Sequence, residues 1–277
     1  MKNILIPTDF SDNSWNAVVY ALDFFKEYPC NFYMLHVSQN VVGNEMGFDF
    51  SDALTPSIVY QSTATDLKKF IDSVKNLSKN KQHRFFPVYE KLFLIDSIRN
   101  QVIEKKIDYI VMGTKGASGL KEMAVGSHTG EVITKVKCPI LVIPEKAHFQ
   151  AVNKIAFPTD FHMNFTPTVI NTLVDVIDMQ NSSLEVLNIK KDTQQLTSLQ
   201  EENKEYLDAY LDTRACSFHT LTHAKIEIAL QSFVDSEHIN LIAMVAKNLN
   251  FFQRLLFEPL VAQISYHTEI PFLVLHE

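Results

Sequence analysis

The stretch "ILIPTDF" at Ile4–Phe10 occurs a second time as "IAFPTDF" at Ile155–Phe161, with five of seven positions identical. A second pair of segments also matches, because Val111–Ile143 aligns without a gap with Ala243–Leu275. Both of these longer segments carry the same apolar pattern, with a proline before the last apolar run. Repetition in the same order along a chain indicates a duplicated structural unit. The sequence therefore predicts one module present twice.

The predicted division of the chain follows from this repeat. We expect a first domain over residues 1–147 and a second over residues 151–277, joined near "PEKAHFQAV" at Pro144–Val152. A chain of 277 residues is long enough for two domains. The second copy is shorter before its fourth strand, and the missing length matches Gln39–Gln61, which has no clean apolar period. We expect a long loop there, which either covers a site or lies on the surface.

Short apolar runs alternate with helical apolar stripes in each copy. Parallel strands separated by helices form a sheet that helices cover on both faces. The expected fold class is therefore α/β, with two tandem, doubly wound, mostly parallel five-stranded sheets. Pro87 indicates an irregular or an edge position for the third strand. The five expected strands of the first copy are "NILIP" (3–7), "FYMLHV" (32–37), "RFFPVY" (84–89), "DYIVMG" (108–113) and "PILVIP" (139–144).

The overall composition excludes several classes of protein. The net charge of −7 and the pI of about 5.8 argue against nucleic acid as a partner, because duplex binding needs clustered Lys and Arg. Three widely spaced cysteines, Cys30, Cys138 and Cys216, show no pairing logic and predict a reduced, cytoplasmic setting. No apolar run reaches the length of a membrane span or a signal peptide. The ten histidines show no metal-ligand spacing.

Glycine is concentrated in one place. The chain has seven glycines, and five of them lie in Gly113–Gly130, directly after the fourth expected strand. Glycine lets a ligand approach the main chain, and the helix expected to open at Gly126–Thr129 would offer free N–H groups to a phosphate. The alternative is a loop that needs glycine only for its turns, with Ser127 as an ordinary helix cap. The P-loop pattern GxxxxGK[ST] and an early GxGxxG are absent.

The glycine spacing resembles that of the universal stress protein family, in a tandem two-domain form. The family's ATP-binding pattern G-x2-G-x9-G-[S/T] is matched by Gly113, Gly116, Gly126 and Ser127. The resemblance extends to "PTD" at Pro7–Asp9 and "LHV" at Leu35–Val37, and it spans both copies. It implies the Rossmann-like fold of the adenine-nucleotide alpha-hydrolase type.

The resemblance also implies a ligand and a set of site residues. Asp9 and Val37 would line the base pocket, Met112–Gly116 would approach the ribose and phosphates, and Gly126–Thr129 would hold the phosphate tail. The ligand would be ATP or a related adenine nucleotide, with Mg²⁺ arriving on the nucleotide. The full set of expected binding residues is Pro7, Thr8, Asp9, Val37, Met112, Gly113, Lys115, Gly116, Gly126, Ser127, His128 and Thr129.

Several of these residues have a structural alternative. Asp9 could cap the following helix rather than contact a ligand. His36 lies in an expected buried strand and is more often a hydrogen-bonded core residue. Lys115 could reach a phosphate as a point charge, but its counterpart Lys247 persists in the second copy, where the glycines are gone.

The second copy has lost the glycine pattern. The ungapped alignment replaces Gly113 by Val245, Gly116 by Asn248, Gly126 by Glu258 and Ser127 by Pro259. A β-branched side chain crowds a ligand, a carboxylate repels phosphate and proline lacks an N–H donor. We therefore expect no ATP binding there by the family's mode, although Asp160 remains.

The two copies are expected to form a pseudo-dimer within one chain. The resemblance implies pairing through the last strand at the sheet edge, since members of the family commonly dimerise there. Here "PILVIP" and "PFLVLH" could pair within one chain and cover edges that would otherwise invite aggregation. Dimerisation of whole chains and an unidentified protein partner stay open.

Three functions remain open on the sequence. The first is a nucleotide-binding protein of stress response or signalling, in which the nucleotide favours one state of the first copy. The second is a slow ATPase, although Glu122 and Glu131 are unconvincing as a general base. The third is an interaction scaffold with a vestigial site. The binding protein is favoured over the enzyme, and we expect no catalytic residues.

Overall fold

Strands and helices alternate along the chain of the computed structural model. The structure describes residues 1–38, 56–91, 93–114, 127–162, 165–190, 195–223, 225–246 and 269–276, without the side chains of 56–63, 127 and 227. The strands are β1 Lys2–Pro7, β2 Cys30–Val37, β3 Arg84–Glu90, β4 Tyr109–Gly113, β5 Ile140–Ile143, β6 Lys154–Pro158, β7 Ser183–Lys190, β8 Cys216–Thr222, β9 Leu241–Val245 and β10 Phe272–Leu275. The helices are α1 Asp12–Phe24, α2 Pro56–Leu77, α3 Leu94–Glu104, α4 Ser127–Lys135, α5 Pro167–Gln180, α6 Ser198–Leu211 and α7 Ile226–Glu237.

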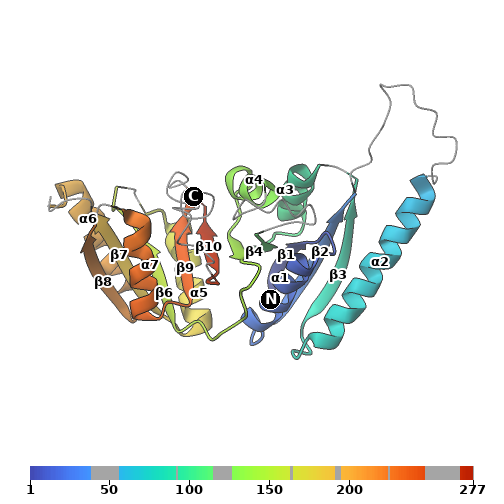
Figure 1. Ribbon diagram of the computed structural model, residues 1–277, viewed down its shortest axis with the longest axis horizontal. Coiled ribbons are helices and arrows are strands. Elements are labelled where there is room, and N and C mark those ends of the chain that lie inside the picture. Colours follow the sequence, from blue (N-terminus) through green and yellow to red (C-terminus); the bar gives the residue numbers. More distant parts are fainter. Residues whose placement is uncertain are drawn as a thin grey trace, which may run out of the picture.

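All ten of these strands belong to one sheet, in the order β3-β2-β1-β4-β5-β10-β9-β6-β7-β8. The order reads the same from either edge toward the middle once β1–β5 are matched with β6–β10. The expected five-stranded arrangements are therefore confirmed, and they form the two halves of a continuous sheet (Figure 1). The first half here means β1–β5 with their helices, and the second half means β6–β10 with theirs.

The two halves meet at β5 and β10, which pair antiparallel, with Leu141 opposite Leu273. The other neighbouring strands of the described sheet pair parallel. Both strands at the junction are buried along their whole length. The expected pairing of the last strand of each copy is confirmed, and neither of these two strands is left as a sheet edge.

Helices cover both faces of the sheet. One hydrophobic core joins α1, α2, α5 and α6 to one face, and a second joins α3, α4 and α7 to the opposite face. Consecutive strand residues alternate between the cores, so that Ile4 belongs to the first and Leu5 to the second. Burial on both faces explains why β1 and β5 read as uninterrupted apolar runs.

Side-chain contacts add to the strand pairing between the halves. Asp175 of α5 accepts hydrogen bonds from the Lys2 ammonium at 2.7 and 2.8 Å and from the Tyr109 hydroxyl. At the last strand, the His276 imidazole Nε2 lies 2.8 Å from the Ile133 carbonyl oxygen of α4. The halves are therefore joined by polar contacts at separate points of the junction.

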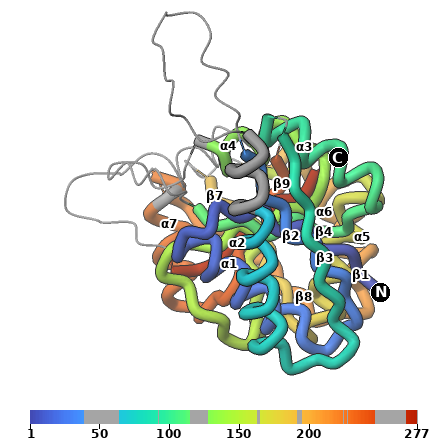
Figure 2. Tube along the Cα trace, turned by 90° about the vertical axis from the view of Figure 1, so that its right-hand side faces the viewer, coloured from blue at the N-terminus to red at the C-terminus, as the bar shows by residue number. Residues whose placement is uncertain are grey.

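The two outer ends of the sheet are β3 and β8. Pro87 lies in β3, and the edge is one of the two positions expected for it. Figure 2, a view from the α2 end, shows α2 running alongside β3. Among the described helices, none combines the length and apolar character that a membrane crossing needs.

Helix α2 begins earlier than the sequence predicts. The loop expected over 39–61 is wrong for its last six residues, since α2 starts at Pro56. Proline fits the first turn of a helix because its missing N–H has no partner there. The segment Gln39–Gln61 as a whole has no clean apolar period, and so the start of the helix within it was not predicted. Residues 39–55 lie outside the described part of the chain.

Candidate functional site

The carboxyl ends of β1, β2 and β4 lie side by side. Strand β1 pairs with β2 on one side and with β4 on the other, so the chain reverses its direction across the sheet at β1. In open α/β sheets, ligands bind at such a switch point, beyond the carboxyl ends of the strands. This edge brings together three separate parts of the expected site: Pro7–Asp9, Val37 and Met112–Gly113.

The turn after β1 is held by its own polar groups. Thr8 is buried, and its N–H donates to the Leu35 carbonyl at 2.8 Å. Asp9 is exposed, and its Oδ1 accepts from the Ser11 N–H at 3.1 Å and from the Ser11 hydroxyl at 2.6 Å. Ser11 in turn caps α1 by accepting from the Ser14 N–H. The Asp9 carboxylate thus helps to shape the entry into α1, which is the structural alternative considered above.

Aromatic rings pack behind this turn. Phe10 has a positive φ of 63° and stacks on the His36 ring at 4.4 Å. The His36 Nδ1 lies 2.8 Å from the Thr8 carbonyl oxygen, and the Tyr89 ring stacks on His36 with 6.1 Å between the ring centroids. His36 is therefore a hydrogen-bonded residue of the framework, as expected. Val37 follows it and is partly buried against the core beneath α3 and α4.

Gly113 at the end of β4 is required by a neighbouring side chain. A Cβ atom at this position would lie 2.5 Å from the Asn13 Nδ2 and 2.8 Å from its Cγ. Asn13, in the first turn of α1, is only 8% exposed. The missing side chain of Gly113 therefore makes room for Asn13, whether or not a ligand also approaches. Sequence reasoning missed Asn13, and its only signal was a polar residue at the second position after the helix cap Ser11.

Helix α4 begins over the end of β4. Thr129 is 2% exposed, and its hydroxyl donates to the Gly113 carbonyl at 2.8 Å. Thr114 is also buried, and its N–H donates to the Ile143 carbonyl. The Thr129 hydroxyl hydrogen is thus used to fasten α4 to β4. His128 is exposed at the start of the helix.

The structure describes only part of the expected phosphate loop. Lys115, Gly116 and Gly126 lie outside the described residues, as does the side chain of Ser127. Met112 is described, and it is partly buried against the core beneath α3 and α4. A helix N-terminus with its free N–H groups beside a strand end is a suitable place for an anion. The described residues therefore provide a turn after β1 and a helix start at the same edge of the sheet.

The second half repeats the turn but not its surroundings. The Thr159 N–H donates to the Leu187 carbonyl at 2.9 Å, and Phe161 has a positive φ of 58°. The Asn188 amide takes the place of His36 and donates to the Thr159 carbonyl at 2.8 Å. In addition, Gln200 of α6 donates to the Asp160 carbonyl at 2.7 Å. The expected losses at Asn248, Glu258 and Pro259 lie outside the described residues.

The cysteines and carboxylates suggest no other centre in the parts of the chain described here. Burial raises the pKa of the Cys30 thiol to about 11 and that of the Cys138 thiol to about 12, which keeps both protonated and unreactive. No group of three metal-ligating side chains comes together among the described residues. The edge formed by β1, β2 and β4 remains the candidate site.

The sequence profile of the universal stress protein family matches residues 1–144 of this chain. The chain belongs to the universal stress protein family. It is 30% identical over 147 residues to universal stress protein MJ0531 of Methanocaldococcus jannaschii, a match that covers 51% of this chain and 81% of that protein. It is 27% identical over 146 residues to universal stress protein YxiE of Bacillus subtilis, covering 51% and 98% of the two chains.

The whole chain also resembles a solved structure. A universal stress protein from Archaeoglobus fulgidus superposes with a TM-score of 0.71 over 99% of this chain and 98% of that one, at 14% identity. At this identity the likeness concerns the fold alone. It extends the resemblance in fold across the second half, beyond the residues that the family profile matches.

Proposed function

We propose that this protein binds one adenine nucleotide per chain, at the carboxyl edge of β1, β2 and β4, and acts in stress response or signalling. The observation that supports this most is the start of α4 at the switch point of the sheet. The Thr129–Gly113 hydrogen bond fixes this helix start beside the end of β4. The motif Gly113, Gly116, Gly126 and Ser127 connects the same two elements in the sequence.

Each part of the edge would have its own task in binding. The exposed Asp9 and the partly buried Val37 would hold the base. Met112–Gly116 would approach the ribose, and Gly126–Thr129 would place N–H groups and the positive end of the α4 dipole at the phosphates. When bound, the nucleotide would supply its own Mg²⁺. We propose residues 1–147 as the nucleotide-binding domain and residues 151–277 as a domain without this site.

The proposal favours binding over catalysis. Glu131, one of the two carboxylates considered as a base, pairs with Lys135 one turn further along α4, at 2.6 Å. This contact lowers the pKa of the Glu131 carboxyl, so that it is a weaker base. Glu122 lies outside the described residues. We propose a cytoplasmic nucleotide-binding protein without a catalytic role for its own side chains.

The test is a calorimetric titration with ATP–Mg²⁺ of the full chain and of Gly126→Glu, which copies Glu258 of the second half. We expect one site per chain in the parent and none in the variant, because a carboxylate at the helix start repels phosphate. The exposed Lys137→Gln changes the net charge equally and should bind as the parent does. Both variants must show the circular dichroism of the parent.

Other results of the same titration have distinct meanings. Absence of binding by the folded parent at millimolar ATP would overturn the proposal and favour a scaffold with a vestigial site. Turnover that disappears in Gly126→Glu would instead make the protein a slow ATPase. Two sites per chain would contradict the assignment of the second half.

A further inference from the structure

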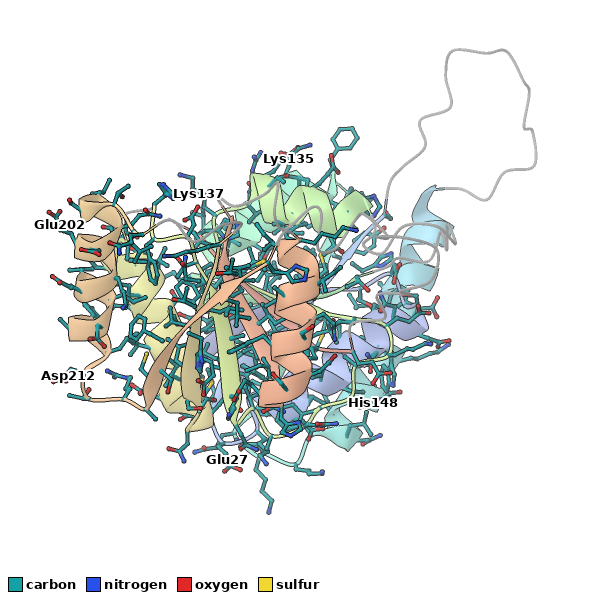
Figure 3. The ribbon with its side chains drawn as sticks, turned by 60° about the vertical axis from the view of Figure 1, so that its left-hand side comes forward. Glu27, Lys135, Lys137, His148, Glu202 and Asp212 are labelled. Atoms are coloured by element: carbon teal, nitrogen blue, oxygen red, sulfur yellow. The ribbon has the colours of Figure 1, made fainter. Side chains whose placement is uncertain are left out.

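A pocket of about 400 Å³ lies away from the candidate nucleotide site, at the link between the two halves. The link leaves β5 at Ile143 and enters β6 at Lys154. Lys146 and His148 of this link line one part of the pocket, and the end of α7 with the residues before β9 and β10 lines another. Figure 3 shows His148 beside one end of α7. The volume lies in the range of small-molecule sites.

Tyr20 of α1 brings an unused hydroxyl to this pocket. The residue is 2% exposed, and its ring packs against Phe149 at 5.3 Å and Phe24 at 6.2 Å. Burial raises the pKa of its hydroxyl, with no contribution from a hydrogen bond. Among the described residues, none forms a hydrogen bond with this hydroxyl. A hydroxyl at the wall of a pocket that no described residue binds is available to donate to a ligand there.

Asn240 presents its amide nitrogen to the same pocket, because its amide oxygen already accepts hydrogen bonds. Its Oδ1 accepts from the main-chain N–H groups of Asn153 at 3.0 Å and Lys154 at 3.1 Å. Because both partners are donors, the amide atom that faces them must be the oxygen. The Nδ2, with two hydrogens to donate, is left for the pocket that Asn240 lines. The Tyr20 hydroxyl and the Asn240 amide therefore suit an acceptor such as a carboxylate.

The pocket also holds groups of opposite sign. Lys146 and His148 come from the link, whereas Asp235 of α7 and Glu269 before β10 are carboxylates. Asp235 is held in place by the Gln231 amide, which donates to its Oδ1 at 2.7 Å. The carbonyl end of α7 adds negative potential beside Asp235. The lining therefore offers both cationic and anionic side chains to a ligand.

We propose that this pocket binds a small zwitterion of the amino-acid class. The ligand carboxylate would accept from the Tyr20 hydroxyl and the Asn240 amide, with Lys146 nearby, and the ammonium would face Asp235 and Glu269. The site is independent of the nucleotide site, because no residue is shared between them. Its position at the link would make it a ligand site at the junction of the two halves.

The test uses ligand-observed saturation-transfer NMR on the full chain with the standard L-amino acids at millimolar concentration. We expect saturation transfer to at least one of them, and affinity at least about tenfold weaker for Tyr20→Phe and for Asn240→Asp. Asn240→Asp keeps the oxygen that accepts from Asn153 and Lys154. Tyr33→Phe, at the far end of the sheet beside Phe86, should bind as the parent does.

The melting temperature of Tyr20→Phe distinguishes a role of Tyr20 in binding from a role in folding. The Tyr20 hydroxyl donates to no described residue, so Tyr20→Phe should keep the melting temperature of the parent, and loss of binding would then not be loss of fold. The N-acetylated and the C-amidated forms of the amino acid that binds should fail to bind, since each lacks one charge. The proposal is overturned if no amino acid binds, if both variants bind like the parent, or if the blocked forms bind equally well.

Discussion

The turns after β1 and β6 are nearly the same, whereas the ends of β4 and β9 differ. Thr8 and Thr159 make the same main-chain hydrogen bond, and Phe10 and Phe161 share a positive φ. Asp160 accepts from the His162 N–H at 3.0 Å, much as Asp9 accepts from Ser11. The shared "PTDF" stretch is therefore sufficiently explained by the turn that it builds. Its presence in both halves does not by itself indicate a ligand.

The difference at the next strands is more informative. Gly113 ends β4 and admits the buried Asn13 from the second position of α1. In the second half, the buried Val245 ends β9, and the second position of α5 is the exposed Thr168. Glycine and asparagine occur together in one half, and valine and threonine in the other. The comparison shows that packing against a neighbouring side chain can require the glycine of the sequence motif, just as a ligand can.

Copying the second half into the first should break this pair. We expect Gly113→Val to lower the free energy of unfolding by about 3 kcal/mol, because its side chain overlaps that of Asn13. Chemical denaturation measures the loss. A double-mutant cycle with Asn13→Ala separates the two costs. We expect Gly113→Val to cost at most half as much in the Asn13→Ala background as in the parent. Strictly additive costs would show that Asn13 is not the obstacle.

The junction between the halves offers a second test. Asp175→Ala should lower the free energy of unfolding by about 2 kcal/mol, since it leaves the buried Tyr109 hydroxyl and Lys2 without their acceptor. Asp178→Ala on the same helix removes an exposed pair with Arg214 and should cost about 0.5 kcal/mol. Equal costs in urea denaturation would contradict a special role for Asp175.

Acid should weaken both halves through buried histidines. Burial lowers the pKa of His83 in the first half and of His276 at the end of the second. The unfolded chain then takes up protons first, so stability is full above about pH 6.5 and falls as pH drops toward the folded pKa. Each histidine contributes a slope of up to about 1.4 kcal/mol per pH unit.

Urea denaturation between pH 7 and pH 5 measures this slope. We expect it to become shallower in the double variant His83→Gln and His276→Gln. The exposed His162→Gln should keep the slope of the parent. A double variant with an unchanged slope would mean that other groups cause the acid sensitivity.

The sequence predicted the repeated fold because the "PTDF" stretch recurs and because burial on both faces leaves a strong apolar signal in inner strands such as β1 and β5. The edge as one of two positions for Pro87 followed from its missing N–H, and the pairing of β5 with β10 from the resemblance. The first turns of α2 were missed, because they were assigned to the segment Gln39–Gln61, which has no clean apolar period as a whole.

For the candidate site, the sequence identified which strand ends meet, but not what their side chains do. The Thr129 hydroxyl is bound to Gly113, and Asn13 occupies the space beside it. Such contacts depend on how α1 and α4 lie against β4, which no local pattern encodes. The roles of all twelve expected residues in nucleotide binding stay predictions.

The antiparallel seam between Leu141 and Leu273 joins two parts of one polypeptide. A seam between separate chains would open on dilution, whereas the partner strand here is always present at the high effective concentration that a covalent link provides. Each half also always faces the other half, and never a copy of itself. The two sides of the seam are thus free of the self-complementarity that a symmetric interface demands. A substitution on one side alters one contact rather than two.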